Sequence, residues 1–577
     1  APGPTQDSVR AVMRAYGASG EDLLLAALAR AFERITGQTQ IAVRLERHGR
    51  SETRGLPATD RTVGWFTTMY PLVVTAVADP GDAVAAVKDA VRAVPEDGVT
   101  YGLRPAGYAD ITTPLTVNYL GDLGRSTVDG FGSTVFNSAG TSVSPTNAFL
   151  PGVRANAMIL DSRLVLRISH ETTVASEAQV ERLADAWLRE VEAIGEHCAG
   201  IGPRIRTAAD FPDAVELTRH DIDVIERFPE HVEDAVELTP LQEGMLVHSL
   251  AGGTDYVVQQ SYLVADPLRS LLTPSRLATA ALAVAARHDA LRSAFVTDSL
   301  SRPLQFVLAE RDVPVAWDDL RGRSATSADI DGLLASDVAH GFDPATDPLL
   351  RIRVVRSDAT DSTGSAVGEE TRLVLTMHHL AVDGWSLSHI LSELVDGCRS
   401  LAAGASAATV LDRARERRSA TAQPRDQVRW IRDQDDGAFT AFWADTLAGY
   451  EATAEFTSAG RSPVLDAGAA PNSTTDPSVD AHGVGRLESA TASDLRRRLD
   501  AAHASSGITV SNLVHAAFAL VLGRESGSDD VVFGSVVSGR DHDVSGLADA
   551  VGLFINTIPV RVQLAPHLST DDLLRSV

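Results

Sequence analysis

The interpretation of this chain starts from one stretch near its middle. It reads Met377-His378-His379-Leu380-Ala381-Val382-Asp383-Gly384-Trp385-Ser386. The apolar residues before it alternate as in a strand, so His378 and His379 should lie on opposite faces of that strand. The apolar residues after it recur at helical spacing, and Ser386 is placed to cap the helix. The two histidines therefore lie where a strand ends and a helix begins, which is a suitable place to hold a base.

Two interpretations of the histidine pair remain open from the residues alone. The histidines could be polar core residues beside an ordinary Asp-Gly turn, or one of them could face a cavity as a base. A metal site is disfavoured, because adjacent strand residues diverge and no third ligand is suitably spaced. The string His-His-x-x-x-Asp-Gly at residues 378–384 resembles the signature of the condensation-domain superfamily of nonribosomal peptide synthetases. That resemblance implies an α/β fold like that of chloramphenicol acetyltransferase, with two sandwich-like lobes in each domain.

Composition excludes several classes of function. The chain has 577 residues, a net charge of −26 and no basic tract, which argues against binding to nucleic acid or to anionic membranes. No apolar run has the length of a membrane-spanning helix. The two cysteines, Cys198 and Cys398, form no disulfide framework and fit a reducing cytoplasm. Lys88 is the only lysine and lies in an apparent amphipathic helix, so we expect neither a Gly-Lys-Ser/Thr phosphate loop nor pyridoxal chemistry.

Two distant parts of the chain follow the same order of elements. Each has an apolar helix, then a strand that ends at Gly-Arg, then a polar loop and a segment that begins with Val-Gly. The matching residues are Ala26 and Ala516, Gly49 and Gly539, and Arg50 and Arg540, each pair 490 positions apart, and Val63 and Val551, 488 positions apart. This internal similarity predicts a duplicated lobe.

The two copies differ at a charged position, since Glu46 corresponds to Val536 at the offset of 490. Taken alone, Glu46 could be a solvated strand residue. Residues 45–50 resemble the Glu-Gly-His-Gly-Arg motif of epimerization domains, the sister class of condensation domains, with Arg47 where that family has Gly. The resemblance implies that Glu46 acts as an acid/base on an α-carbon.

Two further segments resemble elements of epimerization domains. Residues 95–102 resemble Pro-x-x-Gly-x-Gly-Tyr-Gly, and residues 117–121 resemble an Asn-Tyr-Leu-Gly strand. In that family the Asn and Tyr, here Asn118 and Tyr119, approach the active site. The order of these elements supports an epimerization-type lobe over roughly the first 200 residues.

The middle of the chain resembles a condensation domain beyond its histidines. Residues 237–249 resemble the opening motif of condensation domains that follow an epimerization domain, and Pro240 suits a helix start. Residues 287–295 resemble the Arg-His-x-x-Leu-Arg-x-x-Phe element. In the family, the residue that matches Arg292 pairs with the aspartate of the histidine motif, here Asp383, which makes that aspartate structural.

These matches define the expected organisation, a pseudo-dimer of two lobes in each domain, cut in mid-domain at both ends. The expected segments are a C-terminal lobe of an epimerization domain (1–202), an inter-domain linker (203–236), an N-terminal lobe of a condensation domain (237–456), a lobe connector (457–484) and a partial C-terminal lobe of the condensation domain (485–577). We expect the epimerization half to be inactive alone.

The resemblance implies amide-bond formation in nonribosomal peptide synthesis. A donor thioester on the phosphopantetheine of one carrier domain meets an aminoacyl acceptor on another carrier domain. His379 is expected to act as base or to position the amine, while His378 and Asp383 hold the geometry and Gly384 allows a tight turn. The upstream epimerization lobe implies a D-configured donor and an L-configured acceptor. The implied partners are carrier domains and an adenylation domain of the same synthetase, and no covalently bound cofactor is expected in this chain.

Two other functions stay open. The first is a generic acyltransferase of the same fold that acts on coenzyme A or carrier thioesters. The second is a noncatalytic docking domain that only recruits partners. The epimerization-type segment argues against the first, and the intact His-His-x-x-x-Asp-Gly string argues against the second.

Overall fold

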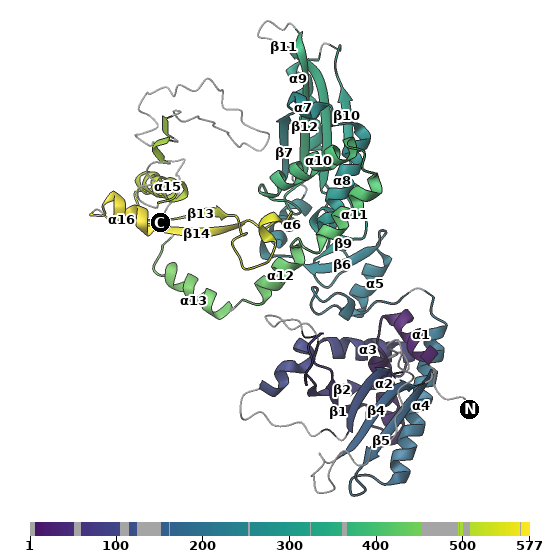
Figure 1. Ribbon diagram of the computed structural model, residues 1–577. Coiled ribbons are helices and arrows are strands. Elements are labelled where there is room, and N and C mark those ends of the chain that lie inside the picture. Colours follow the sequence, from purple (N-terminus) through teal and green to yellow (C-terminus); the bar gives the residue numbers. More distant parts are fainter. Residues whose placement is uncertain are drawn as a thin grey trace. The chain divides into compact units, whose positions relative to one another are not determined.

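A computed structural model gives the structure of the chain in two compact units (Figure 1). The first unit comprises residues 1–237 and 294–310, and the second comprises residues 238–293 and 311–577. The described residues are 6–50, 59, 61–103, 113, 115–123, 152–160, 162–202, 204–251, 254, 256–323, 325–360, 366–434, 436–451, 494–495, 497–499, 508–565 and 567–577. The expected lobe connector at 457–484 lies outside them.

The first unit is built on a five-stranded mixed sheet in the order β2-β1-β3-β4-β5. Its strands are β1 (Gln40–Arg47), β2 (Thr68–Thr75), β3 (Leu115–Asp122), β4 (Val153–Leu160) and β5 (Arg163–His170), and its helices are α1 (Gln6–Tyr16), α2 (Gly20–Thr36), α3 (Pro80–Arg92) and α4 (Glu177–Ala199). Strand β1 pairs antiparallel with β2 and parallel with β3. The alternation expected for residues 41–46 is confirmed, because Ile41, Val43 and Leu45 are buried.

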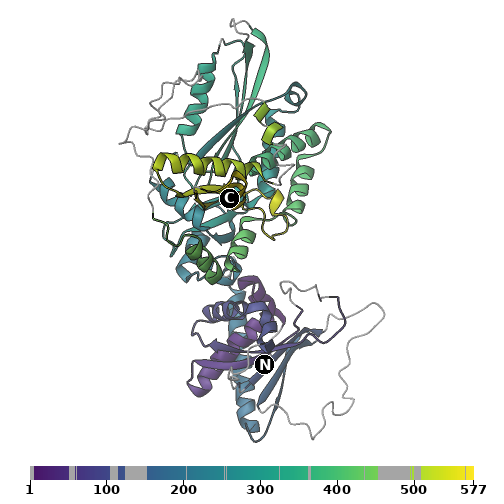
Figure 2. The ribbon, with the colours of Figure 1, turned by 90° about the vertical axis from the view of Figure 1, so that its left-hand side faces the viewer.

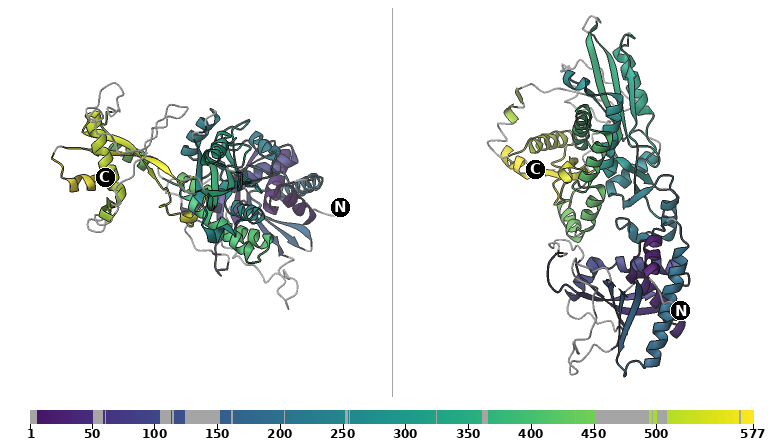
Figure 3. Two further views of the ribbon diagram at one scale, coloured as in Figure 1. Left: turned by 90° about the horizontal axis from the view of Figure 1, so that it is seen from above. Right: turned by 45° about the vertical axis from the view of Figure 1, so that its right-hand side comes forward.

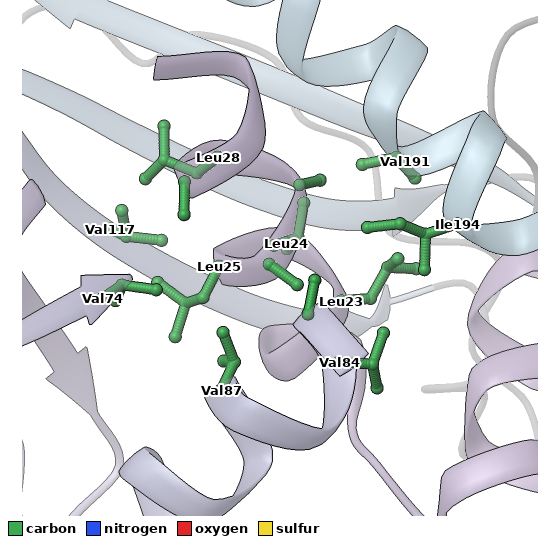
Figure 4. Close-up of a cluster of buried hydrophobic side chains, with 14 of the residues drawn as sticks. Leu23, Leu24, Leu25, Leu28, Val74, Val84, Val87, Val117, Val191 and Ile194 are labelled. Carbon is green, nitrogen blue, oxygen red and sulfur yellow. The ribbon is translucent and has the colours of Figure 1, made fainter. Parts of the chain in front are cut away.

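Helix α2 forms the centre of the core in this lobe. Figure 4 shows its leucines between side chains of α4 on one side and of the sheet on the other, including Leu24 near Ile194 and Leu25 near Val74. The helix begins with a capping box at Ser19 and ends at Gly37, which has a left-handed φ of 75°. Because α2 is covered both by α4 and by the sheet, apolar residues occupy nearly every side of this helix.

The only lysine of the chain faces inward. Lys88 is 1% exposed, and its Nζ donates to the carbonyl of Tyr16 at 2.8 Å and forms an ion pair with Asp210. Asp210 also accepts from the Arg204 guanidinium at 2.6 Å and from the backbone N–H of Thr207 at 2.8 Å. The ion pair thus ties α3 to the start of the segment that was expected to be a linker.

Replacing Lys88 with Met should lower the free energy of unfolding of the first unit by about 1–3 kcal/mol. The cost stays moderate because Asp210 keeps Arg204 and the Thr207 N–H as donors. Urea unfolding of the full chain would measure it, with Arg10→Met, at a side chain that is 55% exposed, as the control. An unchanged unfolding midpoint would contradict the expected contribution of the ion pair.

Residues 203–236, expected to be an inter-domain linker, are folded. They contain the short helices η3 (Ala208–Asp210) and α5 (Arg219–Arg227) and the strand β6 (Val232–Glu237). Strand β6 joins a three-stranded sheet in the order β6-β9-β8, with β9 (Leu304–Leu308) and β8 (Ser293–Val296). The segment folds because it has its own apolar core, in which Phe211 and Ile222 pack with Phe306. The many prolines and acidic residues of this segment interrupt the apolar periodicity that would have predicted a helix or a strand.

The second unit contains a four-stranded sheet in the order β10-β11-β12-β7. Its strands are β7 (Val257–Leu263), β10 (Val315–Asp319), β11 (Leu350–Thr360) and β12 (Ala366–His378), and its helices are α6 (Pro240–Leu250), α7 (Asp266–Arg269), α8 (Pro274–Arg287), η4 (Asp289–Arg292), α9 (Ser327–Ala339), α10 (Ser386–Ala402), α11 (Ala407–Arg418), α12 (Pro424–Arg432) and α13 (Asp436–Thr446). Figure 3 shows β11 and β12 side by side, and the two strands pair antiparallel. Helix α6 begins as expected, with Thr239 as cap and Pro240 at its first position.

The last part of the second unit repeats the start of the first lobe. It consists of α15 (Val510–Ser526), β13 (Asp530–Val537), η5 (Leu547–Asp549), β14 (Asn556–Gln563) and α16 (Thr570–Ser576). Figure 2 shows α15 lying along the β13–β14 pair. The pairing of β13 with β14 has the same register as that of β1 with β2, since Val537 faces Asn556 as Arg47 faces Thr68. The duplication expected from the sequence is confirmed in these elements, and so is the α/β class of the lobes.

Candidate active site

The histidine motif occupies the turn between β12 and α10, as the sequence indicated. His378 is the last residue of β12, and Ser386 is the first residue of α10. The expectation that Ser386 caps the helix is wrong. Instead the Asp383 carboxylate accepts from the Ser386 N–H at 2.9 Å and from its hydroxyl at 2.8 Å. The side chain that accepts from the first backbone N–H of α10 is therefore Asp383, a residue of the histidine motif.

His378 is a buried structural residue. It is 2% exposed, its Nδ1 accepts from the Leu380 N–H at 3.1 Å, and its Nε2 lies 3.1 Å from the Ser249 hydroxyl. Because Nδ1 accepts a hydrogen bond, the neutral ring carries its hydrogen on Nε2. Burial, and secondarily the neighbouring His379, lower the pKa of His378 to about 4. His378 is thus neutral at pH 7 and braces the strand end.

This lowered pKa predicts that the second unit loses stability in mild acid. Between pH 6.5 and about 4 the unfolded chain binds a proton at His378 that the folded chain does not, so the free energy of unfolding falls as pH falls. The loss should approach about 3 kcal/mol near pH 4. Urea unfolding at pH 7 and pH 5 should therefore show a smaller pH effect for His378→Gln than for the unmodified chain. An equal pH effect in both proteins would contradict this origin.

A hydrogen bond to the backbone sets the tautomer of His379. It is half-buried, and its Nδ1 lies 3.0 Å from the carbonyl oxygen of Val382. A carbonyl only accepts, so Nδ1 carries the hydrogen and the lone pair of the neutral ring lies on Nε2. Within the described ranges, the structure records no hydrogen-bond partner for that Nε2. The arrangement leaves Nε2 able to accept a proton or a hydrogen bond from a substrate amine.

Asp383 is held by donors on all sides. Its carboxylate accepts from Arg540 Nη2 at 2.9 and 3.1 Å and from the Phe554 N–H at 3.1 Å, in addition to both Ser386 bonds. The Asp383 N–H in turn donates to the carbonyl of Gly552 at 3.0 Å. The aspartate is 1% exposed, and this burial is compatible with the expected structural role. That role stays a prediction.

The expected partner of that aspartate is wrong. Arg292 donates to Asp289 at 2.7 Å and to the Ala285 carbonyl at 3.0 Å, while Asp383 pairs with Arg540. Arg292 and Asp289 stand at the two ends of the short helix η4, three residues apart, which brings them together locally. Sequence reasoning missed Arg540, although its place in the Gly-Arg break that repeats Gly49-Arg50 marked it.

Gly384 does not meet the conformational expectation. It is absent from the residues with a left-handed φ, and a Cβ built on it would meet nothing within 4 Å. The turn itself therefore does not require glycine. The remaining reason for a glycine here, close approach of a substrate, stays a prediction.

A second group of expected site residues gathers in the first unit. Glu46 and Asn118 face each other in the pairing of β1 with β3, and Tyr119 follows. All three line one cavity of about 540 Å³, together with Glu21, Arg47 and His48. The sequence-based grouping of Glu46, Asn118 and Tyr119 is therefore confirmed as geometry, and their catalytic role stays a prediction.

The cavity beside Glu46 also contains an ion cluster that sequence reasoning missed. Arg47 lies 3.2 Å from the Glu21 carboxylate and forms an ion pair with Asp97. Burial raises the pKa of Glu21, while Arg47 opposes that shift. Asp97 reaches Arg47 from a backbone with a left-handed φ of 51°. Arg47 stands where the epimerization motif has glycine, and this difference could have predicted the cluster. An arginine beside a cavity is expected to pair with carboxylates.

A further cavity, of about 280 Å³, lies between α8, α10 and α11 in the second unit. It is lined by Arg287, Arg399, Arg413 and Arg417 and includes neither His378 nor His379. No group of three His, Cys, Asp or Glu side chains in the described parts of the chain could hold a metal ion. Separately, no helix among those parts has both the length and the apolar character to cross a bilayer.

Comparison with known proteins identifies the class. The family model described as "Condensation domain" matches residues 2–213 and 232–577. Because these matches cover nearly the whole chain, the chain belongs to the condensation-domain family found in nonribosomal peptide synthetases.

Individual relatives are large synthases. The chain is 29% identical over 596 residues to a mycosubtilin synthase polypeptide of Bacillus subtilis, covering 99% of this chain and 21% of that protein. It is 27% identical over 586 residues to bacitracin synthase 3 of Bacillus licheniformis, covering 99% of this chain and 9% of that protein. The chain thus spans at most about a fifth of the length of these relatives.

Solved structures were also matched. The first condensation domain of the CDA synthetase matches with a TM-score of 0.42 at 17% identity, over 59% of this chain and 72% of that structure. The epimerization domain from the third module of tyrocidine synthetase B matches with a TM-score of 0.30 at 26% identity, over 34% of this chain and 46% of that structure.

Proposed function

We propose that the second unit forms an amide bond between two substrates held as thioesters on the phosphopantetheine arms of partner carrier domains. The acceptor amine attacks the donor carbonyl, the carbon–sulfur bond breaks, and the donor carrier leaves as a thiol. The partners are the carrier domains and the adenylation domain of the same synthetase. The observation that carries the proposal is the His379 ring, whose Nδ1–H donates to Val382 and whose Nε2 is left for an amine.

His379 serves the reaction in one of two ways. It takes the proton that the amine loses on attack, or it accepts a hydrogen bond that positions the amine and stabilises its developing positive charge. Both roles need the neutral ring with its lone pair on Nε2, which the Val382 carbonyl favours. The Asp383–Arg540 pair and His378 fix the turn that carries this ring.

The test loads a synthetic donor and an aminoacyl acceptor onto separate carrier proteins and adds the full chain. Amide product is followed by intact mass of the acceptor carrier. Product that depends on the chain supports amide formation. Product on soluble coenzyme A thioesters, with none on carriers, would favour the generic acyltransferase. No product with either, from folded chain and loaded carriers, would favour a docking domain.

The stereochemical part of the proposal concerns the donor. If an epimerization domain precedes the condensation unit, the donor arrives with a D-configured terminal residue, and the acceptor is L-configured. The resemblance of the opening segment at residues 237–249 supports this order. The same assay with D- and L-terminated donors should give faster product from the D donor. Equal rates would remove the stereochemical part and leave amide formation standing.

We further propose that Glu46 contributes proton transfer at an α-carbon, as in epimerization domains. The cavity that gathers Glu46, Asn118 and Tyr119 supports a small-molecule site there. In a fusion of this chain to the N-terminal lobe of an epimerization domain, a carrier-bound aminoacyl group should take up solvent deuterium at its α-carbon. Glu46→Gln should abolish that uptake, while Arg44→Gln, on the same strand, should not. Uptake that survives Glu46→Gln would reject the role.

A further inference from the structure

The cavity of about 280 Å³ in the second unit contains more cations than anions. It lies among α8, α10 and α11, which are neighbours in the structure (Figure 1). Its charged lining consists of four arginines and two carboxylates, namely Arg287, Arg399, Arg413, Arg417, Glu393 and Asp396. A local excess of positive charge is unexpected in a chain whose net charge is −26. We therefore ask which of these charges are already paired.

Both carboxylates at the cavity already have cationic partners. The Glu393 carboxylate accepts from Arg287 Nη1 at 2.9 Å and from the Nε2–H of His288 at 3.0 Å. Asp396 pairs with Arg399, which lies three residues further along α10. Each carboxylate is thus matched by an arginine of the same lining. Neither of them neutralises the two arginines that remain, which both lie on α11.

The two remaining arginines, Arg413 and Arg417, stand four residues apart on the face of α11 that lines the cavity. Among the described residues, neither side chain has an ion pair or a hydrogen bond. In contrast, Arg418 of the same helix pairs with Asp289 at 2.7 Å. The helix dipole favours cations in the last turn of α11, which includes Arg417 but not Arg413. Like charges at this spacing repel each other, and an anion between them would remove that repulsion.

A third arginine is held in a fixed position at the same cavity. Arg287, at the end of α8, is half-buried, and its Nε and Nη2 donate to the Thr421 hydroxyl at 3.1 and 3.0 Å. Its Nη1 donates to Glu393 at 2.9 Å. A guanidinium has five N–H donors, so these three bonds leave two for a ligand. Because the group is already held on two sides, binding an anion there orders little further structure.

From these observations we propose that the cavity binds the phosphate group of a small phosphomonoester. Arg413 and Arg417 pair with the phosphate oxygens, and Arg287 donates to them from α8. The charge fits, since two unpaired cations meet a group that carries about −1.5 to −2 at pH 7. Guanidinium groups also suit phosphate because they donate two parallel hydrogen bonds. The organic part of the ester contacts apolar lining residues, which include Val284 and Val410.

Titration of the full chain with glycerol phosphate, followed by phosphorus NMR, tests the charge of the site. We expect a dissociation constant on the order of 1 mM from a few charge-assisted hydrogen bonds. Arg413→Gln and Arg417→Gln should each weaken binding about tenfold. Arg415→Gln removes the same charge from the same helix at a position outside the lining, so it is the control and should bind normally. No binding by the unmodified chain, or equal weakening in all three variants, would overturn the proposal.

A second substitution tests the cavity apart from its charge. Ala414→Leu keeps all four arginines and fills part of the space between them, so it should weaken the binding of glycerol phosphate. Unchanged binding in this variant would place the anion on the open surface and reject the cavity. Binding of inorganic phosphate without binding of glycerol phosphate would reject the phosphomonoester. Urea unfolding without ligand checks that each variant is folded. Because neither motif histidine lines this cavity, the outcome is independent of amide formation.

Discussion

Replacing His379 with alanine should slow amide formation on loaded carriers by about 10²–10⁴-fold. The reason is geometric, because the Val382 carbonyl holds the ring by Nδ1 and leaves Nε2 as the acceptor at the turn. Alanine removes that acceptor and leaves the buried brace at His378 intact. Intact-mass assays of the acceptor carrier would follow the loss. His340→Ala, at an exposed helix end in the same unit, is the matched control and should keep the full rate.

Amide substitutions separate the two roles of His379. A general base should not be replaced by asparagine or glutamine, because an amide oxygen does not take up a proton near neutral pH. A positioning acceptor should be partly replaced by His379→Asn or His379→Gln, which keep a carbonyl oxygen. A full rate in His379→Ala would remove both roles and favour scaffolding by the second unit.

The second large effect is expected at the anchor of the turn. Asp383→Ala should leave Arg540 buried without its carboxylate and lower the free energy of unfolding of the second unit by about 3–5 kcal/mol. The cost is high because both side chains are buried, at 0% and 7% exposure, and the carboxylate serves several donors. Urea unfolding of the full chain would measure it.

A double-mutant cycle isolates the pair itself. If Asp383 and Arg540 interact directly, the cost of Asp383→Ala should be much smaller in an Arg540→Ala background. Asp319→Ala, which breaks a pair with Arg321 on the surface of the same unit, should cost far less and serves as the control. Additive costs at Asp383 and Arg540 would contradict the pairing in the folded protein.

Local sequence patterns predicted the elements that carry the sites. Alternation gave β1 with Leu45 buried and Glu46 on the other face, and helical spacing gave α10 with Ile390 and Leu394 buried. The grouping of Glu46 with Asn118 came from a resemblance, and the register of β1 with β3 supplies its geometry. The strand and the helix depend on residues that are close together in the chain, so a short sequence pattern is enough to predict them.

Contacts between distant segments were harder to predict. Nothing near Asp383 indicated that its cation stands at position 540, because the pair depends on how two lobes meet. The secondary structure within 203–236 was not foreseen for the same reason, since Phe211 and Ile222 find their apolar partners on β9. The internal repeat was the signal that could have corrected the first error. Arg540 lies 490 positions after Arg50, and a glycine precedes each of the two arginines, at Gly49 and Gly539.

The turn that carries His379 and Asp383 is held by two lobes of the second unit. His379 lies four residues before the aspartate that Arg540 and the Phe554 amide grip from the second lobe of the same unit. Separating those lobes would break the bonds of Asp383 to Arg540 and to the Phe554 N–H. It would therefore disturb the loop that orients the His379 ring. The Asp383–Arg540 ion pair therefore couples the spacing of the two lobes to the orientation of the His379 ring.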